Sequence, residues 1–302
     1  MSQNKAPVFK QMLKAEFPNL SVETVKVLGT GWHHDAVEVN GSIIFRIPHH
    51  TYGQDITPET VRREVGLLKF LQDQVPVKIP DPQYVAADKS YFGYPKLDGV
   101  ILHDIVGTFN HDDWERLKRD WVAIASALHK NVTIEIARSL KVPDFIPPSS
   151  NTVQGIFGMP GVNEDIMDFA RGVIKQLGSY DPAPGSYVFI HSDLQSRNIL
   201  TDPETKRITG LIDWTDARWG PLSREFSIYE WMRGNLLSEA TLLYEEKTGV
   251  PVDVGQARLW YSLDELSSYV DQIKAGKSDE AAESLQRIKH LIVAEREFPS
   301  HV

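Results

Sequence analysis

A polar loop between two apolar runs carries the residues with the clearest catalytic chemistry. Positions 191–198 read HSDLQSRN, and they lie between the runs YVFI and IL. Asp193 can accept or orient the proton of an attacking hydroxyl, and an amide five positions later, Asn198, can hold a metal ion. We expect His191 to brace the loop rather than to touch a substrate. This set suits transfer of a phosphoryl group to an alcohol, although the loop alone also fits a polar turn between two strands.

A second carboxylate follows at the end of the next apolar run. Asp213 follows the apolar residues Leu211 and Ile212 in the stretch GLIDW, fifteen positions after Asn198. A buried carboxylate is costly unless it is paired or bound to a metal. Mg²⁺ prefers one or two protein oxygen ligands together with water and phosphate oxygens, so Asn198 and Asp213 make a chemically sensible pair. Taken alone, Asp213 also fits a cap at the end of a strand, but the joint spacing with the loop favours the metal.

The N-terminal third offers groups that could hold phosphates. Gly29 and Gly31 lie in the run LGTGW, which fits either a phosphate-binding loop or a plain turn. Arg46 ends the apolar run IIFR. Glu64 lies three residues after Val61 and four before Leu68, so it falls on the apolar stripe of the expected helix. We expect it to pair with Arg46, or alternatively to reach water from the edge of the stripe.

The elements that must position these residues follow from local patterns. Asn40-Gly41 between β-rich runs predicts a hairpin within a stretch of strands over residues 25–47. Thr57-Pro58 predicts a helix N-terminus. We also expect a helix at 7–17, strands at 83–87, 91–96, 186–190, 197–201 and 207–212, a hinge at 95–99, and helices from Pro221 to about residue 296. Strands first and helices later, with a small sheet between them, is an α+β arrangement.

Composition limits the classes of function. The chain has 302 residues, no cysteine and a formal charge of −9. Thiolate metal sites and cysteine nucleophiles are excluded, and an acidic chain disfavours non-specific nucleic-acid binding. With no signal-peptide core and no apolar run long enough to span a bilayer, we expect a cytoplasmic protein with no membrane partner. The pairs His33-His34 and His49-His50 lack an accompanying ligand pattern, so we interpret them as solvated turn residues.

The sequence resembles a known enzyme family over residues 25–235. HSDLQSRNIL followed by GLIDWTDARWGPLSREFS is similar to the catalytic core of the aminoglycoside and macrolide phosphotransferases. GTGWHHDAVEVNGSIIFRIPHH resembles their nucleotide lobe, and GYPKLDGV resembles their hinge. The resemblance implies a two-lobed, protein-kinase-like fold, with a nucleotide-binding N-lobe at 1–96 and a helical C-lobe with the acceptor site at 97–302.

The same resemblance implies a role for each candidate residue. Asp193 would be the catalytic base, and Asn198 and Asp213 would bind Mg²⁺. The N-terminal residues would bind the nucleotide. Its phosphates would lie against Gly29, Gly31 and Arg46, with Glu64 as the partner of Arg46. Its base would contact the main chain of Pro95 and Leu97, and Tyr94 would be the gatekeeper that limits the inner pocket. A large aromatic gatekeeper implies that GTP is accepted besides ATP. Asp216, Glu230 and Trp231 would face the acceptor. Three positions depart from relatives: Arg46 stands where many have Lys, Glu225 where many have Asp, and Gln195 where protein kinases have Lys.

These features favour a small-molecule kinase, acting as a monomer or weak dimer, that phosphorylates an antibiotic hydroxyl. Acidic residues such as Asp216, Glu225 and Glu230 suit an aminoglycoside, whereas Trp214, Trp219 and Trp231 suit a macrolide; solvated acids and core indoles are the alternative. A metabolite kinase acting on choline, homoserine or a sugar stays open, because one fold carries many acceptors. A pseudokinase is disfavoured by the complete Asp193, Asn198 and Asp213 set, and a hydrolase by the missing nucleophile motif.

Overall fold

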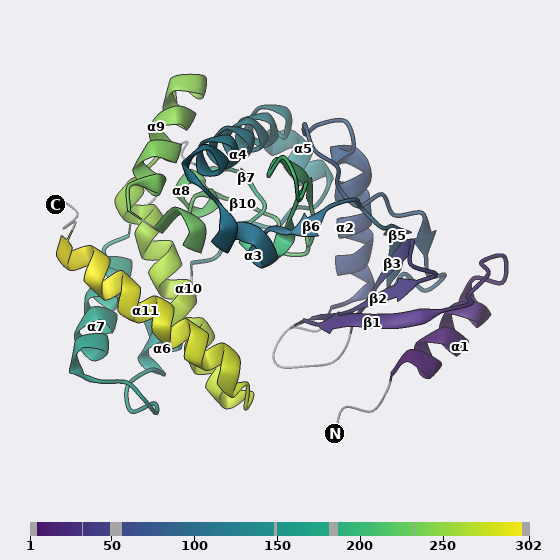
Figure 1. The fold of residues 1–302 in the computed structure, drawn as a ribbon, viewed down its shortest axis with the longest axis horizontal. Coiled ribbons are helices and arrows are strands. Elements are labelled where there is room, and N and C mark those ends of the chain that lie inside the picture. Colours follow the sequence, from purple (N-terminus) through teal and green to yellow (C-terminus); the bar gives the residue numbers. More distant parts are fainter. Residues whose placement is uncertain are drawn as a thin grey trace. The chain divides into compact units, whose positions relative to one another are not determined.

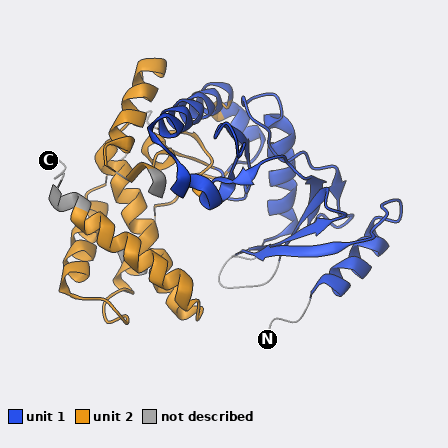
Figure 2. Cartoon of the chain, viewed as in Figure 1, with its two compact units in different colours: residues 1–131, 135–142, 197–217 blue, residues 132–134, 143–196, 218–302 orange. Residues whose placement is uncertain are grey.

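The computed structural model describes residues 5–31, 33–48, 56–147, 150–180, 187–232 and 234–297, with side chains omitted at a few of these. Contacts divide the chain into two compact units (Figure 2). Unit 1 comprises residues 1–131, 135–142 and 197–217, and unit 2 comprises residues 132–134, 143–196 and 218–302. The functional division expected after residue 96 stays a prediction.

A five-stranded antiparallel sheet forms the N-terminal part of unit 1 (Figure 1). Its order is β1-β2-β3-β5-β4, built from β1 (Val25–Thr30), β2 (His34–Val39), β3 (Ile43–Pro48), β4 (Tyr84–Val85) and β5 (Phe92–Pro95). The predicted turn between β2 and β3 is confirmed, because Asn40 and Gly41 have φ values of +53° and +71°. Only residues that tolerate the left-handed region suit these positions.

Strand alternation gives the two faces of this sheet different neighbours. Phe45 and Ile47 point toward α1 (Ala6–Glu16), where they join a core that includes Phe9 and Leu13. The alternate residue Arg46 points to the opposite face, toward α2 (Pro58–Leu71). Thr57 caps α2 as predicted, since its hydroxyl accepts the Thr60 N–H. Because side chains alternate along β3, Arg46 faces α2, which contains its partner Glu64.

A second, three-stranded sheet completes unit 1. Its order is β6-β8-β9, with β6 (Val100–Ile101), β8 (Ile199–Thr201) and β9 (Ile208–Leu211). Gly99 precedes β6 with φ +120°, and a Cβ there would lie 2.7 Å from the Thr209 hydroxyl, so the hinge requires glycine. The remaining helices in or bordering this unit are α3 (Leu102–Ile105), η1 (Val106–Thr108), α4 (His111–Asn131), α5 (Ile134–Ser139) and η2 (Ser196–Asn198).

Unit 2 is mostly helical. Its helices are α6 (Ser150–Gln154), α7 (Glu164–Gly178), α8 (Leu222–Glu225), η3 (Tyr229–Met232), α9 (Leu236–Thr248), α10 (Val254–Lys274) and α11 (Ser278–Glu297). Residues such as Phe169 and Trp260 form its core, where α7, α10 and α11 pack together. The strands β7 (Tyr187–Ile190) and β10 (Arg218–Pro221) pair as an antiparallel ribbon.

The α+β class expected from the sequence is confirmed, with an antiparallel sheet first and helices later. The expected strands appear within a few residues of their predicted limits. The sequence did not predict β10, because glycine and proline make up half of that strand and both are depleted in strands. No helix among the described residues is long and apolar enough to cross a membrane.

Candidate active site

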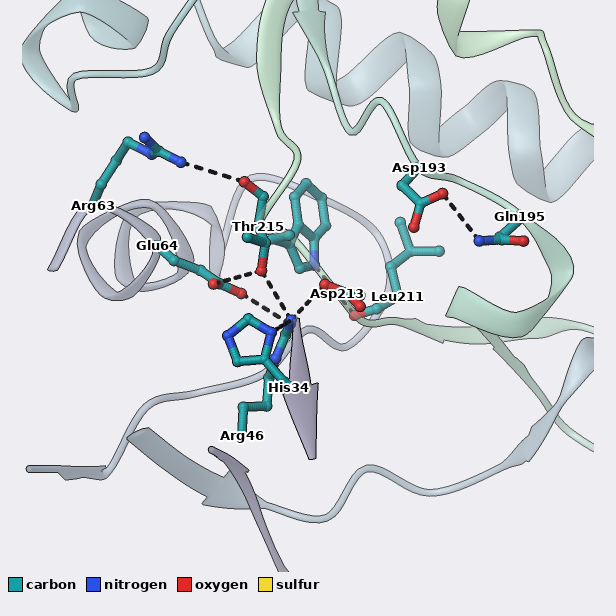
Figure 3. Close-up of polar contacts among 10 residues, drawn as sticks. His34, Arg46, Arg63, Glu64, Asp193, Gln195, Leu211, Asp213 and Thr215 are labelled. Carbon is teal, nitrogen blue, oxygen red and sulfur yellow. Dashed lines mark hydrogen bonds and ion pairs between the residues drawn. The ribbon is translucent and has the colours of Figure 1, made fainter. Parts of the chain in front are cut away.

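A buried ion pair joins the sheet of unit 1 to α2, as predicted from the stripe pattern. Arg46 Nη1 donates to Glu64 Oε1 at 3.0 Å, with the two side chains only 7% and 2% exposed. The second terminal nitrogen, Nη2, lies 2.5 Å from Asp213 Oδ1, 2.9 Å from Thr215 Oγ1 and 3.3 Å from His34 Nδ1 (Figure 3). The cluster therefore gathers side chains from β2, β3, α2 and the segment after β9.

The charges in this cluster shift each other's titration. Burial raises the pKa of the Glu64 carboxyl above its ordinary value, although Arg46 and a hydrogen bond from Thr215 oppose the shift. Burial also opposes the charge of Arg46, but the coulombic attraction of Asp213 and Glu64 outweighs it and raises the pKa of the guanidinium. Arg46 is thus permanently cationic beside two carboxylates, one buried and one, Asp213, 42% exposed.

The two expected metal ligands lie at the same end of the β8–β9 hairpin. Ile199 pairs with Leu211, and one step further the Ile212 N–H donates to the Asn198 carbonyl at 3.0 Å. Asp213 follows with φ +66°, an uncommon conformation for an aspartate in an ordered chain. Such strain persists only where the surroundings enforce it, and it often marks functional sites.

The donors at this hairpin end fit a hard divalent cation. The Asp213 carboxylate is partly exposed and the Asn198 residue is 8% exposed, and both present oxygen atoms. No group of three or more His, Asp or Glu ligands occurs among the described residues. Mg²⁺ needs few protein ligands because it keeps water and phosphate oxygens, so a two-residue set matches Mg²⁺ better than a protein-enclosed zinc or calcium site.

The residues expected to contact the nucleotide all belong to unit 1. Tyr94 is 5% exposed on β5, and burial raises the pKa of its hydroxyl to about 12. Pro95, the last residue of β5, and Leu97, in the segment between β5 and β6, are both half-buried. Gly29 lies at an irregularity in β1, and the Gly31 N–H donates to the His34 carbonyl at 2.9 Å. Contact of these residues with a nucleotide stays a prediction.

The expected base, Asp193, lies in unit 2, three residues before the chain passes into unit 1. Its Oδ1 accepts a hydrogen bond from Gln195 Nε2 at 3.0 Å (Figure 3). Gln195, at the position of the protein-kinase lysine, therefore orients the carboxylate through a neutral amide. His191 is fully buried, in keeping with a bracing role.

The main chain just before Asp193 is held by two consecutive residues of α8. Glu225 accepts the His191 N–H at 3.0 and 3.2 Å and the Ser192 N–H at 3.4 Å. Arg224 Nη2 donates to the Ser192 carbonyl at 3.2 Å, and Arg224 Nη1 pairs with Asp264 of α10. Ser192 has φ +71°, so this brace fixes a strained residue. The expectation that Glu225 meets substrate amino groups is wrong, because its side chain is 1% exposed beneath the loop.

The expected acceptor residues have different surroundings. Asp216 is half-buried, and its charge contributes to the raised pKa of Glu64. Trp231 is 1% exposed, so its indole packs inside unit 2. The side chain of Glu230 lies outside the described part of the chain. The substrate roles of all three stay predictions.

Reasoning from sequence missed three residues that contact the candidate groups: His34 and Thr215 in the charged cluster of unit 1, and Arg224 at the loop before Asp193 in unit 2. The interpretation of His34 as a solvated turn residue is wrong, since His34 is 9% exposed and contacts Arg46. Its place on the same strand face as Ala36, across the hairpin from Arg46, was the available signal. Thr215 and Arg224 carried no local signal, because their partners are 151 and 40 positions away. His49 and His50 lie outside the described residues.

Two sequence comparisons relate this chain to known proteins. A family model described as the phosphotransferase enzyme family matches residues 24–242. A curated relative, the uncharacterized protein YcbJ of Bacillus subtilis, is 24% identical over 250 residues, covering 75% of this chain and 74% of that protein.

Two solved structures show the fold. An aminoglycoside 2″-phosphotransferase in complex with GDP and kanamycin has a TM-score of 0.75 at 23% identity, over 94% of this chain and 98% of that one. A macrolide 2′-phosphotransferase of type I has a TM-score of 0.69 at 19% identity, over 93% and 97%. The protein-kinase-like fold expected from the sequence is therefore confirmed.

Proposed function

Because this chain belongs to the phosphotransferase enzyme family, we propose that it transfers the γ-phosphate of GTP or ATP to a hydroxyl group of an antibiotic, with an aminoglycoside favoured. The buried cluster of Arg46, Glu64 and Asp213 carries the proposal. A permanently charged guanidinium, fixed between a buried and a half-exposed carboxylate, suits the anchoring of a triphosphate and its counter-ion.

In the proposed reaction, the acceptor hydroxyl attacks the γ-phosphorus, an oxygen–phosphorus bond forms, and the bond to the β-phosphate oxygen breaks. The hydroxyl proton passes to Asp193, and the nucleoside diphosphate leaves. Mg²⁺ bound by Asn198 and Asp213 would neutralise charge on the β- and γ-phosphate oxygens. Arg46 contributes fixed positive charge toward the phosphates, and Gln195 keeps the Asp193 carboxylate in one orientation.

For the phosphate donor, we propose that GTP is used besides ATP. The large side chain of Tyr94 is buried beside the charged cluster, whose Arg46, Asp213 and Glu64 all influence its pKa. An aromatic ring at this point would limit the depth of a pocket for the nucleotide base. Titration of the protein with GTP and with ATP in the presence of Mg²⁺ tests this, and a strong preference for ATP would remove the idea.

For the acceptor, the acidic chain and Asp216 favour a polycationic aminoglycoside. Solved relatives of similar fold include complexes with kanamycin and with gentamicin. A macrolide is the second candidate, supported by the fold of the macrolide 2′-phosphotransferases. We retain the cytoplasm as the expected compartment, which cell fractionation tests.

The deciding experiment is a screen for acceptor-stimulated release of GDP or ADP, using aminoglycosides, macrolides and small alcohols. We expect an aminoglycoside to stimulate release in the wild type. In Asp193→Asn turnover should fall by about 10²-fold or more while nucleotide binding survives, because the base is lost and the phosphate anchor is intact. Asp271→Asn, at an exposed position on α10, is the matched control. Near-normal turnover in Asp193→Asn would refute the role of Asp193.

A further inference from the structure

Thr215 occupies the centre of the charged cluster in unit 1. Its side chain is buried, with the residue 5% exposed. The hydroxyl accepts from Arg46 Nη2 at 2.9 Å and donates to Glu64 Oε2 at 2.9 Å, while its carbonyl accepts from Arg63 Nη2 at 3.4 Å. The two oxygens of Glu64 are thereby divided, one bonded to Arg46 and the other to Thr215.

A single hydroxyl is well suited to this place. It donates one hydrogen and accepts others, so it can satisfy an anion and a cation at the same time. Thr215 also follows Asp213 by two residues in the chain, so its bond to Glu64 ties the segment carrying a proposed metal ligand to α2. The geometry of the ion pair and that of the metal ligand are therefore coupled through one side chain.

The number of hydrogen-bond acceptors around Arg46 Nη2 shows how Thr215 affects the freedom of Asp213 to leave Arg46. The nitrogen carries two hydrogens, whereas three atoms that can accept them lie within 3.3 Å: Asp213 Oδ1, Thr215 Oγ1 and, in the tautomer of His34 with its hydrogen on Nε2, His34 Nδ1. If Asp213 turns to a cation, Nη2 still has two acceptors for its two hydrogens. Without the Thr215 hydroxyl, the same event would leave a buried guanidinium hydrogen unsatisfied, which is costly.

Resting on the proposed function, we infer that Thr215 is a positioning residue that lets Asp213 exchange Arg46 for the divalent cation. It provides the alternative acceptor for Arg46 and keeps Glu64 in place while Asp213 is engaged. The residue acts through Arg46, Glu64 and Asp213 and needs no contact with nucleotide or acceptor.

The test measures how nucleotide binding depends on Mg²⁺ concentration, using GTP and ATP with the full chain. Thr215→Val keeps the shape of the side chain and removes the hydroxyl. We expect the Mg²⁺ concentration at half-maximal binding to rise by about tenfold, the scale of one hydrogen bond to a charged group. Thr215→Ser, which keeps the hydroxyl, should stay within about twofold of the wild type.

A matched control separates this role from general loss of a buried hydroxyl. Thr201 is fully buried in the same unit and its hydroxyl donates only to the Val100 carbonyl at 3.3 Å among the contacts described. Thr201→Val should lower thermal stability without moving the Mg²⁺ midpoint. Thr215→Cys, whose thiol is a weak donor and acceptor, provides a second variant if Thr215→Val does not fold, with a midpoint shift in the same direction.

The outcomes separate this inference from the proposed function. Wild-type protein that binds neither nucleotide in any Mg²⁺ concentration would overturn the proposed function, and this inference with it. Wild-type protein that binds with Mg²⁺ dependence, beside a folded Thr215→Val or Thr215→Cys variant with the same midpoint, would overturn the role of Thr215 alone. A raised midpoint in these variants, with rescue by Thr215→Ser, supports the role.

Discussion

Glu225, the residue of α8 that braces the main chain before Asp193, should make the stability of the protein depend on pH. The residue is 1% exposed, and its carboxyl accepts the N–H groups of His191 and Ser192. Burial raises the pKa of this carboxyl from 4.5 to about 7, against the opposing effect of the two N–H donors. The folded state therefore holds this proton more tightly than the unfolded state.

The sign and size of the effect follow from linkage. The stabilising contribution of a protonated Glu225 is complete below pH 4.5, falls as pH rises, and is lost above pH about 7. At about 1.4 kcal/mol per pKa unit, the full change is roughly 3 kcal/mol, of which about 2.5 kcal/mol falls between pH 5 and pH 8. Glu225→Gln, which mimics the protonated carboxyl, should lack this part of the pH dependence.

Urea unfolding followed by tryptophan fluorescence between pH 5 and pH 8 measures the difference. The wild type should lose about 2.5 kcal/mol of unfolding free energy that Glu225→Gln keeps, so the difference between the two should grow by this amount from pH 5 to pH 8. Glu245→Gln, at an exposed position on α9, should show a constant difference and serves as the control. A difference between Glu225→Gln and the wild type that stays constant from pH 5 to pH 8 would refute the reasoning.

Three further predictions concern unit 1. In steady-state assays Arg46→Lys should raise the KM for nucleotide about tenfold, because one ammonium cannot reproduce the two separate nitrogens that contact Glu64 and its other partners; an unchanged KM would contradict this. Asp35→Asn should lower the free energy of unfolding by about 1–2 kcal/mol in denaturant titrations, because buried Asp35 pairs with Lys5 at 2.8 Å, and equal midpoints would count against it. Asn40→Ala should cost about 2 kcal/mol in the same titration, since Asn40 combines φ +53° with side-chain bonds to three main-chain groups, whereas a cost within error would contradict that account.

Local chemistry explains why much of the fold was predictable from sequence. The turn at Asn40-Gly41 needs left-handed φ values, and the cap at Thr57 needs a hydroxyl before a proline. The pairing of Arg46 with Glu64 could be predicted because each residue puts a charge on a buried face. The strand periodicity of apolar residues places Arg46 there, and the helix periodicity places Glu64 there. Each of these patterns spans no more than about twenty residues, so it can be recognised without knowledge of the fold.

Contacts between distant segments explain what the sequence did not predict. Thr215 has ordinary neighbours in the chain, and only the fold brings it to Glu64, 151 positions away. Glu225 was placed near the substrate because its carboxylate suits an amino group, yet the fold uses it for main-chain N–H groups. Strand β10 forms despite Gly220 and Pro221 because β7 supplies its pairing partner. In each case the long-range partner outweighs the local preference.

The brace formed by Arg224 and Glu225 contacts peptide groups and leaves the side chain of Ser192 out of its bonding. The conformation of this loop is therefore stabilised by side chains of α8 and not by the side chain of Ser192. Position 192 can therefore be varied, next to the proposed base Asp193, while the contacts that hold its main chain stay in place, and glycine there would relieve the strain of φ +71°. Substitutions at position 192, with α8 left intact, should therefore carry a low cost in folding stability.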